Sequence, residues 1–314
     1  MPWGDFSRSA AVGRSGTPLS RHRAGCYHRR HEPSRRTQTT RMPTISQNDF
    51  TPDLFVDLSR ARRVWAVAAV HGAVERLAAV HDLIGERFES GDRLVNLGDL
   101  MGGGDVRATL NEALRFRRSV LAQPPLYLPE DIVYLRGRQE EMWHKLLQIH
   151  FAPKPKELLR WMLERGVDAT LRSYGADPAQ AFSAAEEGMV ALTRWTGRLK
   201  AAVQAVPGHH AWFTGLRRYA HTGPGGILFV HAGLDPTRSL ADQRDAFWWE
   251  SGTFARAAAG FDGFARIVRG YDPAGGGWVE DGATLTIDGG CGTGGPLYAA
   301  CLAPDGTLLD RVEA

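Results

Sequence analysis

The segment Arg93–Gly104, RLVNLGDLMGGG, constrains the fold more than any other part of this sequence. It consists of a short apolar run, then the carboxylate of Asp99, and then a loop that is too rich in glycine to form a helix. This pattern predicts a buried strand that ends at a charged residue. Because aspartate is also an ordinary turn residue, the pattern becomes informative only where the chain repeats it.

The pattern of an apolar run followed by glycine and a polar side chain recurs in four further segments, Val64–Gly72, Ile132–Glu140, Gly226–Gly233 and Ile267–Pro273. Five strands are therefore expected to end at His71, at Asp99, at Arg138 with Gln139, at His231 and at Tyr271. Ligands of open α/β sheets bind at the carboxyl ends of the strands. We therefore expect these side chains to converge on one site.

The order of the elements predicts an α/β fold. An apolar strand over Val64–Val70, a helix over Ala73–Phe88 and a strand over Leu94–Leu97 make a βαβ unit with a right-handed crossover. A second helix is expected over Val106–Ala122 and a strand over Asp131–Leu135. From about residue 141 to 222, helical segments alternate with proline and glycine breaks, and the pattern predicts no strand there. We interpret this stretch as a helical insertion.

After the insertion the strand signals return, at Ile227–Val230 and at Arg266–Arg269. The segment 273–282 is expected to be a flexible loop. Thr284–Ile287 and Leu297–Leu302 are expected to pair as a terminal hairpin around the glycine-rich DGGCGTGG. That glycine run lacks the lysine and the following helix that a phosphate-binding P-loop requires.

The amino-terminal residues differ from the rest of the chain in composition. Met1–Arg41 contains nine arginines against Asp5 and Glu32, a formal charge of +7. Because the whole chain carries +3, the remaining residues carry about −4. We predict a disordered basic tail over residues 1–47 and a folded domain over 48–314. The tail is compatible with a solvated leader, with a start at Met42 instead of Met1, or with a basic arm for anionic partners.

Several classes of function are excluded at this stage. A mildly acidic folded part has no general nucleic-acid footprint, and the chain has no apolar run of membrane length. The three cysteines, Cys26, Cys291 and Cys301, form neither a disulfide framework nor a metal-ligand spacing, which predicts a reducing cytoplasm. No GxGxxG follows the first strand, which disfavours a dinucleotide-binding oxidoreductase.

The five strand-end motifs resemble those of the calcineurin-like metallophosphoesterases, in particular the bacterial branch akin to serine/threonine phosphoprotein phosphatases. That family carries GDxHG, GDxxDRG, GNHE, HAG and GH in this order, with a helical insertion between the third and fourth motifs. The resemblance covers residues 64–302 and implies a β-sandwich flanked by helices. It also implies phosphoester hydrolysis at two divalent metal ions of manganese, iron or zinc, held by carboxylate, imidazole and amide ligands.

The motifs of this chain depart from the family pattern at the metal site. The resemblance assigns three residual metal ligands, His71, Asp99 and His231, and three replaced ligand positions, Ala69, Arg138 and Tyr271. Gln139 stands where the family has the histidine that protonates the leaving group, and Gly102 and Gly103 stand where it has an aspartate and a phosphate-binding arginine. Glutamine delivers no proton near neutral pH, so the resemblance predicts impaired or lost hydrolysis.

Three functions fit this sequence. The first is a phosphatase-fold protein that has lost hydrolysis and binds a phosphate ester or phosphoprotein through Arg138, without a metal cofactor. The second is an active phosphoesterase that uses a single metal on His71 and Asp99. The third is a protein-interaction scaffold that uses the helical insertion and Trp248-Trp249, two side chains that otherwise fill the core or line the pocket. Oligomeric state and substrate do not follow from the sequence.

Overall fold

Strand β2 (Arg63–Val67), helix α1 (Val74–Gly85) and strand β3 (Asp92–Asn96) form the expected βαβ unit in the computed structural model, which describes residues 55–124 and 126–314. The two strands pair in parallel, with Trp65 opposite Leu94. The tail expected over residues 1–47, and with it the choice between Met1 and Met42, lies outside the described residues.

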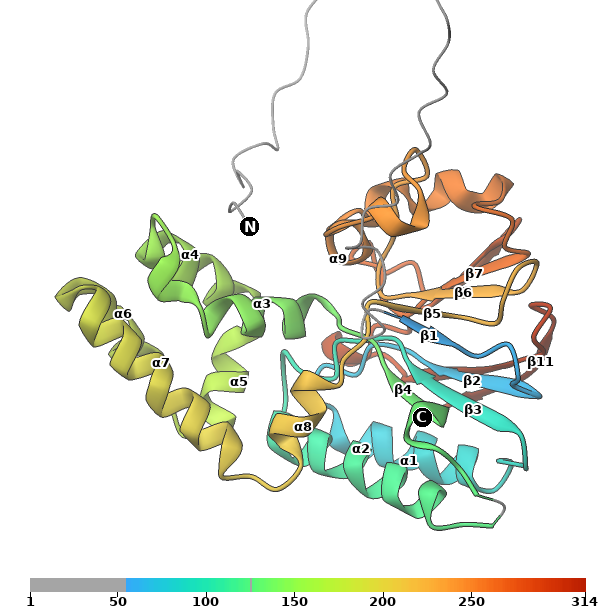
Figure 1. The fold of residues 1–314 in the computed structure, drawn as a ribbon, viewed down its shortest axis with the longest axis horizontal. Coiled ribbons are helices and arrows are strands. Elements are labelled where there is room, and N and C mark those ends of the chain that lie inside the picture. Colours follow the sequence, from blue (N-terminus) through green and yellow to red (C-terminus); the bar gives the residue numbers. More distant parts are fainter. Residues whose placement is uncertain (1–54, 125) are drawn as a thin grey trace, which may run out of the picture. The chain divides into compact units, whose positions relative to one another are not determined.

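The strands of the described residues form two mixed sheets (Figure 1). The first has the order β1-β5-β6-β7-β9-β8 and consists of β1 (Phe55–Asp57), β5 (Tyr219–His221), β6 (Ile227–Val230), β7 (Arg266–Arg269), β9 (Thr284–Ile287) and β8 (Trp278–Asp281). The second has the order β11-β10-β2-β3-β4 and adds β11 (Leu308–Glu313), β10 (Tyr298–Leu302) and β4 (Ile132–Tyr134).

Burial in β6 explains how the first sheet packs. Ile227 and Phe229 belong to the large core that also contains the residues of β2, β3 and β10, whereas Leu228 and Val230 belong to a second core with Phe247 of helix α9 (Ala246–Trp249). Successive side chains of a strand point to opposite faces of its sheet. The two sheets therefore share one core, and helix α9 covers the outer face of the first sheet. This confirms the α/β class, a β-sandwich flanked by helices.

Helix α2 (Val106–Leu121) packs beside α1 (Figure 1). Six helices follow β4 before the chain enters β5, namely α3 (Arg138–Leu146), α4 (Pro155–Met162), α5 (Asp168–Ser173), α6 (Pro178–Glu187), α7 (Met189–Gln204) and α8 (His209–Thr214). A π-helical turn, Leu163–Val167, joins α4 to α5. The 3₁₀ turns are Pro129–Asp131, Ile149–Phe151, Leu240–Asp242, Ser251–Ala259 and Cys291–Thr293.

Three predictions about strands and loops are wrong. Residues 141–222 contain the short strand β5, which is held between β1 and β6 by long-range pairing that no local pattern reveals. Thr284–Ile287 and Leu297–Leu302 do not form a hairpin, because β9 pairs with β7 and β8 in the first sheet and β10 pairs with β2 and β11 in the second. The segment expected to be a flexible loop over residues 273–282 contains β8, the partner that β9 uses instead.

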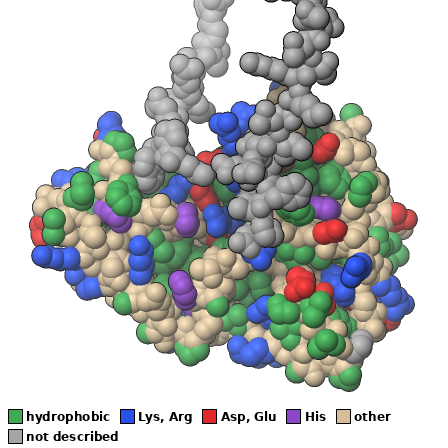
Figure 2. All heavy atoms as spheres, in the orientation of Figure 1, with side chains coloured by type: hydrophobic (Ala, Val, Ile, Leu, Met, Phe, Trp, Pro, Cys, Tyr) green, Lys and Arg blue, Asp and Glu red, His purple; other side chains and the backbone are tan. Residues whose placement is uncertain are grey.

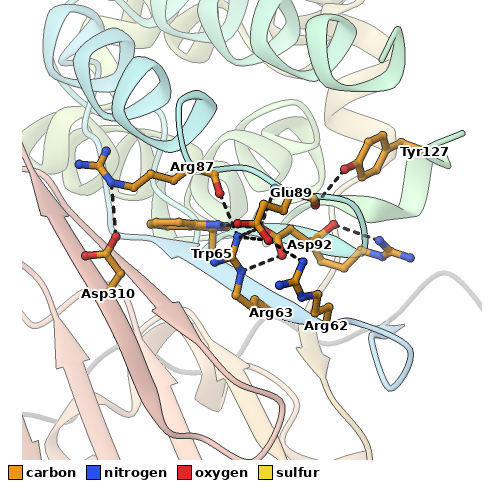
Figure 3. Close-up of polar contacts among 9 residues, drawn as sticks. Arg62, Arg63, Trp65, Arg87, Glu89, Asp92, Tyr127 and Asp310 are labelled. Atoms are coloured by element: carbon orange, nitrogen blue, oxygen red, sulfur yellow. Dashed lines mark hydrogen bonds and ion pairs between the residues drawn. The ribbon is translucent and has the colours of Figure 1, made fainter. Parts of the chain in front are cut away.

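A saturated polar cluster lies at the amino-terminal ends of β2 and β3 (Figure 3). The buried carboxylate of Asp92 accepts hydrogen bonds from Arg63 Nε and Nη2 at 2.9 and 2.6 Å, from Trp65 Nε1 at 3.3 Å and from the Glu89 amide at 3.0 Å. Arg62 forms an ion pair with Glu89 at the exposed rim of this cluster. A buried charge with this many partners stabilises the sheet instead of straining it.

Charge on the surface and the hydropathy of the helices can be described directly. On the face shown in Figure 2, basic and acidic side chains are interspersed with apolar ones. Among the described residues, none of the helices combines the length and the hydropathy required to traverse a bilayer.

Candidate functional site

The loops that follow five strands meet at one place, as the strand-end pattern predicts. Backbone hydrogen bonds join them: the His71 amide donates to Asp99 O at 2.8 Å, the Ala69 amide to Gly270 O at 3.0 Å, and the Tyr271 amide to His231 O at 3.1 Å. The fifth loop joins through Asp99, whose Oδ1 accepts from the Gln139 amide at 2.7 Å.

Glycines permit this close approach. A Cβ atom at Gly98 would lie 2.7 Å from the Gly137 backbone, and one at Gly137 would lie 2.2 Å from Asp99 Oδ1. The neighbouring side chains that carry chemistry also adopt an uncommon backbone conformation, because His71 and Asp99 both have φ of 51°. Non-glycine residues in this region cost roughly 1–3 kcal/mol each and cluster at functional sites.

Asp99 and His231 are fully buried and face each other, with Asp99 Oδ2 3.4 Å from His231 Nε2. His231 Nδ1 lies 2.8 Å from the Leu97 carbonyl and must therefore donate its proton there. Neither Nε2 nor Oδ2 has a hydrogen-bond partner. The space between Nε2 and Oδ2 therefore suits a proton or a small cation.

The electrostatics of Asp99 favour its ionised form. Burial opposes ionisation, but the charges of His231, His71 and Arg138 nearby outweigh it and lower the pKa of Asp99. Asp99 is therefore a carboxylate at neutral pH, and it has one backbone donor and a histidine at long range.

A second buried carboxylate, Glu140, belongs to the site and was not singled out from the sequence. Its Oε2 accepts from the amides of Asp99 and Gly137 at 2.9 and 2.8 Å, and its Oε1 accepts from the Met101 amide at 3.2 Å. Burial and then the charge of Asp99 raise the pKa of Glu140 to about 7. Glu140 therefore fixes the loop after β3 against the start of α3.

Arg138, the first residue of α3, points to Tyr271. Its Nη2 donates to the Tyr271 hydroxyl at 2.6 Å, and its guanidinium carbon lies 4.2 Å from the centre of that ring and 5.9 Å from the centre of the Trp249 ring. Arg138 Nε is buried without a partner. No carboxylate of the described residues pairs with Arg138, and Asp99 in particular does not.

His71 and Tyr271 complete the cluster through ring contacts. The Tyr271 ring stacks on His231 with the ring centres 5.4 Å apart, and it meets His71 edge-on at 5.6 Å. Burial lowers the pKa of His71 and raises the pKa of Tyr271. A neutral phenol is a poor metal ligand, and Tyr271 instead holds Arg138 and separates the two histidines.

Gln139 and the two tryptophans have distinct positions. The Gln139 side chain donates from Nε2 to Arg165 O of the helical insertion at 2.7 Å. Trp248 is buried in the second core and donates to the Arg136 carbonyl, whereas Trp249 is half-buried between Arg138 and Trp161. One tryptophan therefore fills the core, and its neighbour contacts the site.

The residues present do not fit a pair of metal ions. Ala69 is apolar and buried, Arg138 is a cation, and Tyr271 is a protonated phenol. Across residues 55–124 and 126–314, histidine, cysteine, aspartate and glutamate form no group of three that could hold a metal. Asp99 Oδ2 and His231 Nε2, both unpartnered, face each other at 3.4 Å and are the donor atoms that remain at this place.

Comparisons with known proteins return solved structures only. No family model and no curated protein sequence matches the chain. One similar structure is of a diadenosine tetraphosphatase, with 18% identity, a TM-score of 0.46, and coverage of 83% of this chain and 97% of the other. A serine/threonine phosphatase from Saccharomyces cerevisiae is 14% identical, with a TM-score of 0.46 and coverage of 83% of this chain and 82% of the other. A cold-active protein-tyrosine phosphatase from Shewanella is 13% identical, with a TM-score of 0.40 and coverage of 83% of this chain and 82% of the other. These likenesses concern the fold alone.

Proposed function

We propose that this protein binds a phosphate ester or phosphoprotein through Arg138 and that its capacity for hydrolysis is impaired or lost. The observation that carries the proposal is the state of Arg138. Its guanidinium lies where five loops converge, it has no carboxylate partner among the described residues, and its Nε is buried without an acceptor. The N–H groups of a guanidinium match the geometry of phosphate oxygens, and a phosphate would supply the acceptor that Nε lacks.

The neighbours of Arg138 support an anion in the same place. The Tyr271 hydroxyl accepts a hydrogen bond from Arg138, so its own proton is free to be donated. Arg138 is also the first residue of α3, whose amino-terminal dipole favours negative charge. Asp99 is fully buried, whereas Arg138 is only partly buried, so an anion can reach the guanidinium without contacting the carboxylate.

The same site offers little for hydrolysis. Gln139 occupies the position that the family resemblance gives to the general acid, and its amide is committed to Arg165 O. Without the histidine that serves as general acid in the family and without ligands for two metal ions, neither that route of leaving-group protonation nor activation of water by a metal pair is supported.

A thermal-shift experiment tests the proposal. Phosphate at ten times its Kd should raise the free energy of unfolding by about 1.4 kcal/mol, and a phosphopeptide should act in the same way. Arg138→Ala should abolish the shift. Arg311→Ala is the matched control, because Arg311 also stacks on aromatic rings, 4.5 Å from Trp278 and 4.2 Å from Tyr298, but pairs with Glu313.

The alternative of a residual phosphoesterase is favoured by one observation, the unpartnered Asp99 Oδ2 and His231 Nε2 at 3.4 Å. Chelator-treated protein assayed on an aryl phosphate with added manganese distinguishes the two functions. Our proposal predicts that wild type and Asp99→Asn show the same background rate, with no turnover that depends on Asp99. Metal-dependent turnover lost in that variant would establish the phosphoesterase instead. Wild-type protein that responds neither to millimolar phosphate nor to a phosphopeptide would refute our proposal, and if it also lacked metal-dependent turnover the scaffold would be favoured.

A further inference from the structure

A cavity of about 380 Å³ lies away from the convergent site, between helix α2, strand β4 and helix α8. Its walls are largely apolar and come from Val56, Leu114, Ile132, Val133, Tyr134 and Trp212. The rings of Tyr134 and Trp212 meet edge-on with their centres 5.9 Å apart. This volume lies within the range of pockets that hold small organic molecules.

Three arginines and a single acidic residue, Glu130, also line the cavity. Among the described residues, none of the three arginines, Arg117, Arg118 and Arg217, has a carboxylate within 4.0 Å, although the chain pairs many of its other arginines. Arg217 donates from Nη1 to the Gly215 carbonyl at 3.0 Å. The cavity therefore has an excess of positive charge beside an apolar wall.

Two buried donors at this cavity have no acceptor. Arg117 makes one long contact, from Nη2 to Pro129 O at 3.4 Å, and its Nε is buried without a partner. Trp212 is only 4% exposed, and its Nε1 is also unpartnered. Buried donors without acceptors are uncommon in native proteins, and each loses hydration without compensation unless a ligand or water accepts from it.

We propose that this cavity binds a small organic anion with an apolar body, whose carboxylate or phosphate head lies among Arg117, Arg118 and Arg217. The apolar wall would cover the body of the ligand, while the head would receive charge-assisted hydrogen bonds. Arg138 does not line the cavity, so this inference is independent of the function proposed above.

Isothermal titration calorimetry of the full chain tests the proposal with four probes. Octanoate and octyl phosphate have an apolar body with one anionic head each, octanol has the body without the charge, and inorganic phosphate has the charge without the body. We expect one of the two anionic probes to bind this cavity with a stoichiometry of one, counted in Arg138→Ala so that a phosphate ester bound at Arg138 does not add to it. Octanol should bind at least about tenfold more weakly, because it cannot accept charge-assisted hydrogen bonds. The stronger of the two anionic probes identifies the head group.

Variants locate the binding. Arg117→Gln with Arg217→Gln should weaken the preferred probe at least about tenfold, and Ala211→Phe on α8 should exclude it by filling the cavity. Arg107→Gln is the matched control, since Arg107 is an exposed arginine on α2, the helix of Arg117, and lies outside this cavity. Failure of both anionic probes to bind, equal binding of octanol, unchanged binding in both pocket variants, or loss of binding in Arg138→Ala would each overturn the proposal.

Discussion

Strand β3 begins at one buried aspartate and leads directly to another, and the surroundings of the two carboxylates differ. Asp92 accepts four hydrogen bonds, two of them from the guanidinium of Arg63 (Figure 3). Asp99 accepts one within normal range, from the Gln139 amide, and its Oδ2 has no partner. Both side chains are buried to the same extent.

The charges near the two aspartates differ in the same way. At the first end of the strand, the arginine and the carboxylate neutralise each other in bidentate geometry. At the second end, the arginine turns to a tyrosine and the carboxylate faces a histidine, so both retain unsatisfied atoms. One end of the sheet is completed by the chain itself. The other keeps buried polar atoms without partners, which is the physical basis for proposing function there.

Replacing each aspartate by asparagine gives the largest expected effect. Asp92→Asn should lower the free energy of unfolding by about 3 kcal/mol, because it leaves Arg63 and a buried donor set without their anion. Asp99→Asn should lower it by less than about 1 kcal/mol, since the amide oxygen can still accept from Gln139. Urea unfolding of both variants measures the difference. Equal losses would remove the distinction between the two ends.

The helical insertion contains a buried histidine, His209, whose titration should make stability depend on pH. His209 is buried and bonds to Tyr174 at 2.6 Å and to Asn111 at 3.0 Å, and burial, followed by the charge of Arg107, lowers the pKa of His209 to about 4. Protons therefore bind the unfolded chain more tightly between pH 6.5 and 4, and stability falls as pH falls through this window.

His209→Gln should remove that dependence. Wild type should lose about 1–2 kcal/mol more than the variant on going from pH 6.5 to pH 5, as measured by urea unfolding at each pH. Equal losses of the free energy of unfolding in the two proteins would show that acid destabilises the fold through groups other than His209.

The smallest effect is expected at the rim of the saturated cluster. Arg62 and Glu89 form an ion pair in which the side chains are 59% and 51% exposed. Exposed pairs contribute between zero and about 1 kcal/mol, so Arg62→Ala should change the urea midpoint little. A loss as large as that of Asp92→Asn would mean that the rim, and not the buried carboxylate, holds this end together.

The strands that deliver the site could be predicted from the sequence because each carries its own local signal. β6 and β7 occupy the expected residues, and the loops ending at Asp99 and His231 meet as predicted. Pairing between strands carries no such signal. β5 exists because β1 and β6 flank it, and β9 and β10 are neighbours in sequence that enter different sheets.

The same limit applies within the site. Glu140 resembles an ordinary acidic residue in the first turn of a helix, and its function as acceptor for the Asp99 amide depends on a contact across 41 residues. The orientation of Arg138 toward Tyr271 spans 133 residues. Sequence identified both side chains of that bond as site residues but did not pair them.

Calorimetric titration of inorganic phosphate into chelator-treated protein tests the central claim most directly, with Arg138→Ala and Arg63→Lys as the paired variants. The account predicts one phosphate per chain in wild type and in Arg63→Lys, and none in Arg138→Ala. It also predicts that Arg63→Lys unfolds at lower urea because it loses the bidentate bond to Asp92, whereas Arg138→Ala stays within about 1 kcal/mol of wild type. Phosphate binding that survives in Arg138→Ala, or a loss of stability in that variant as large as in Arg63→Lys, would contradict it.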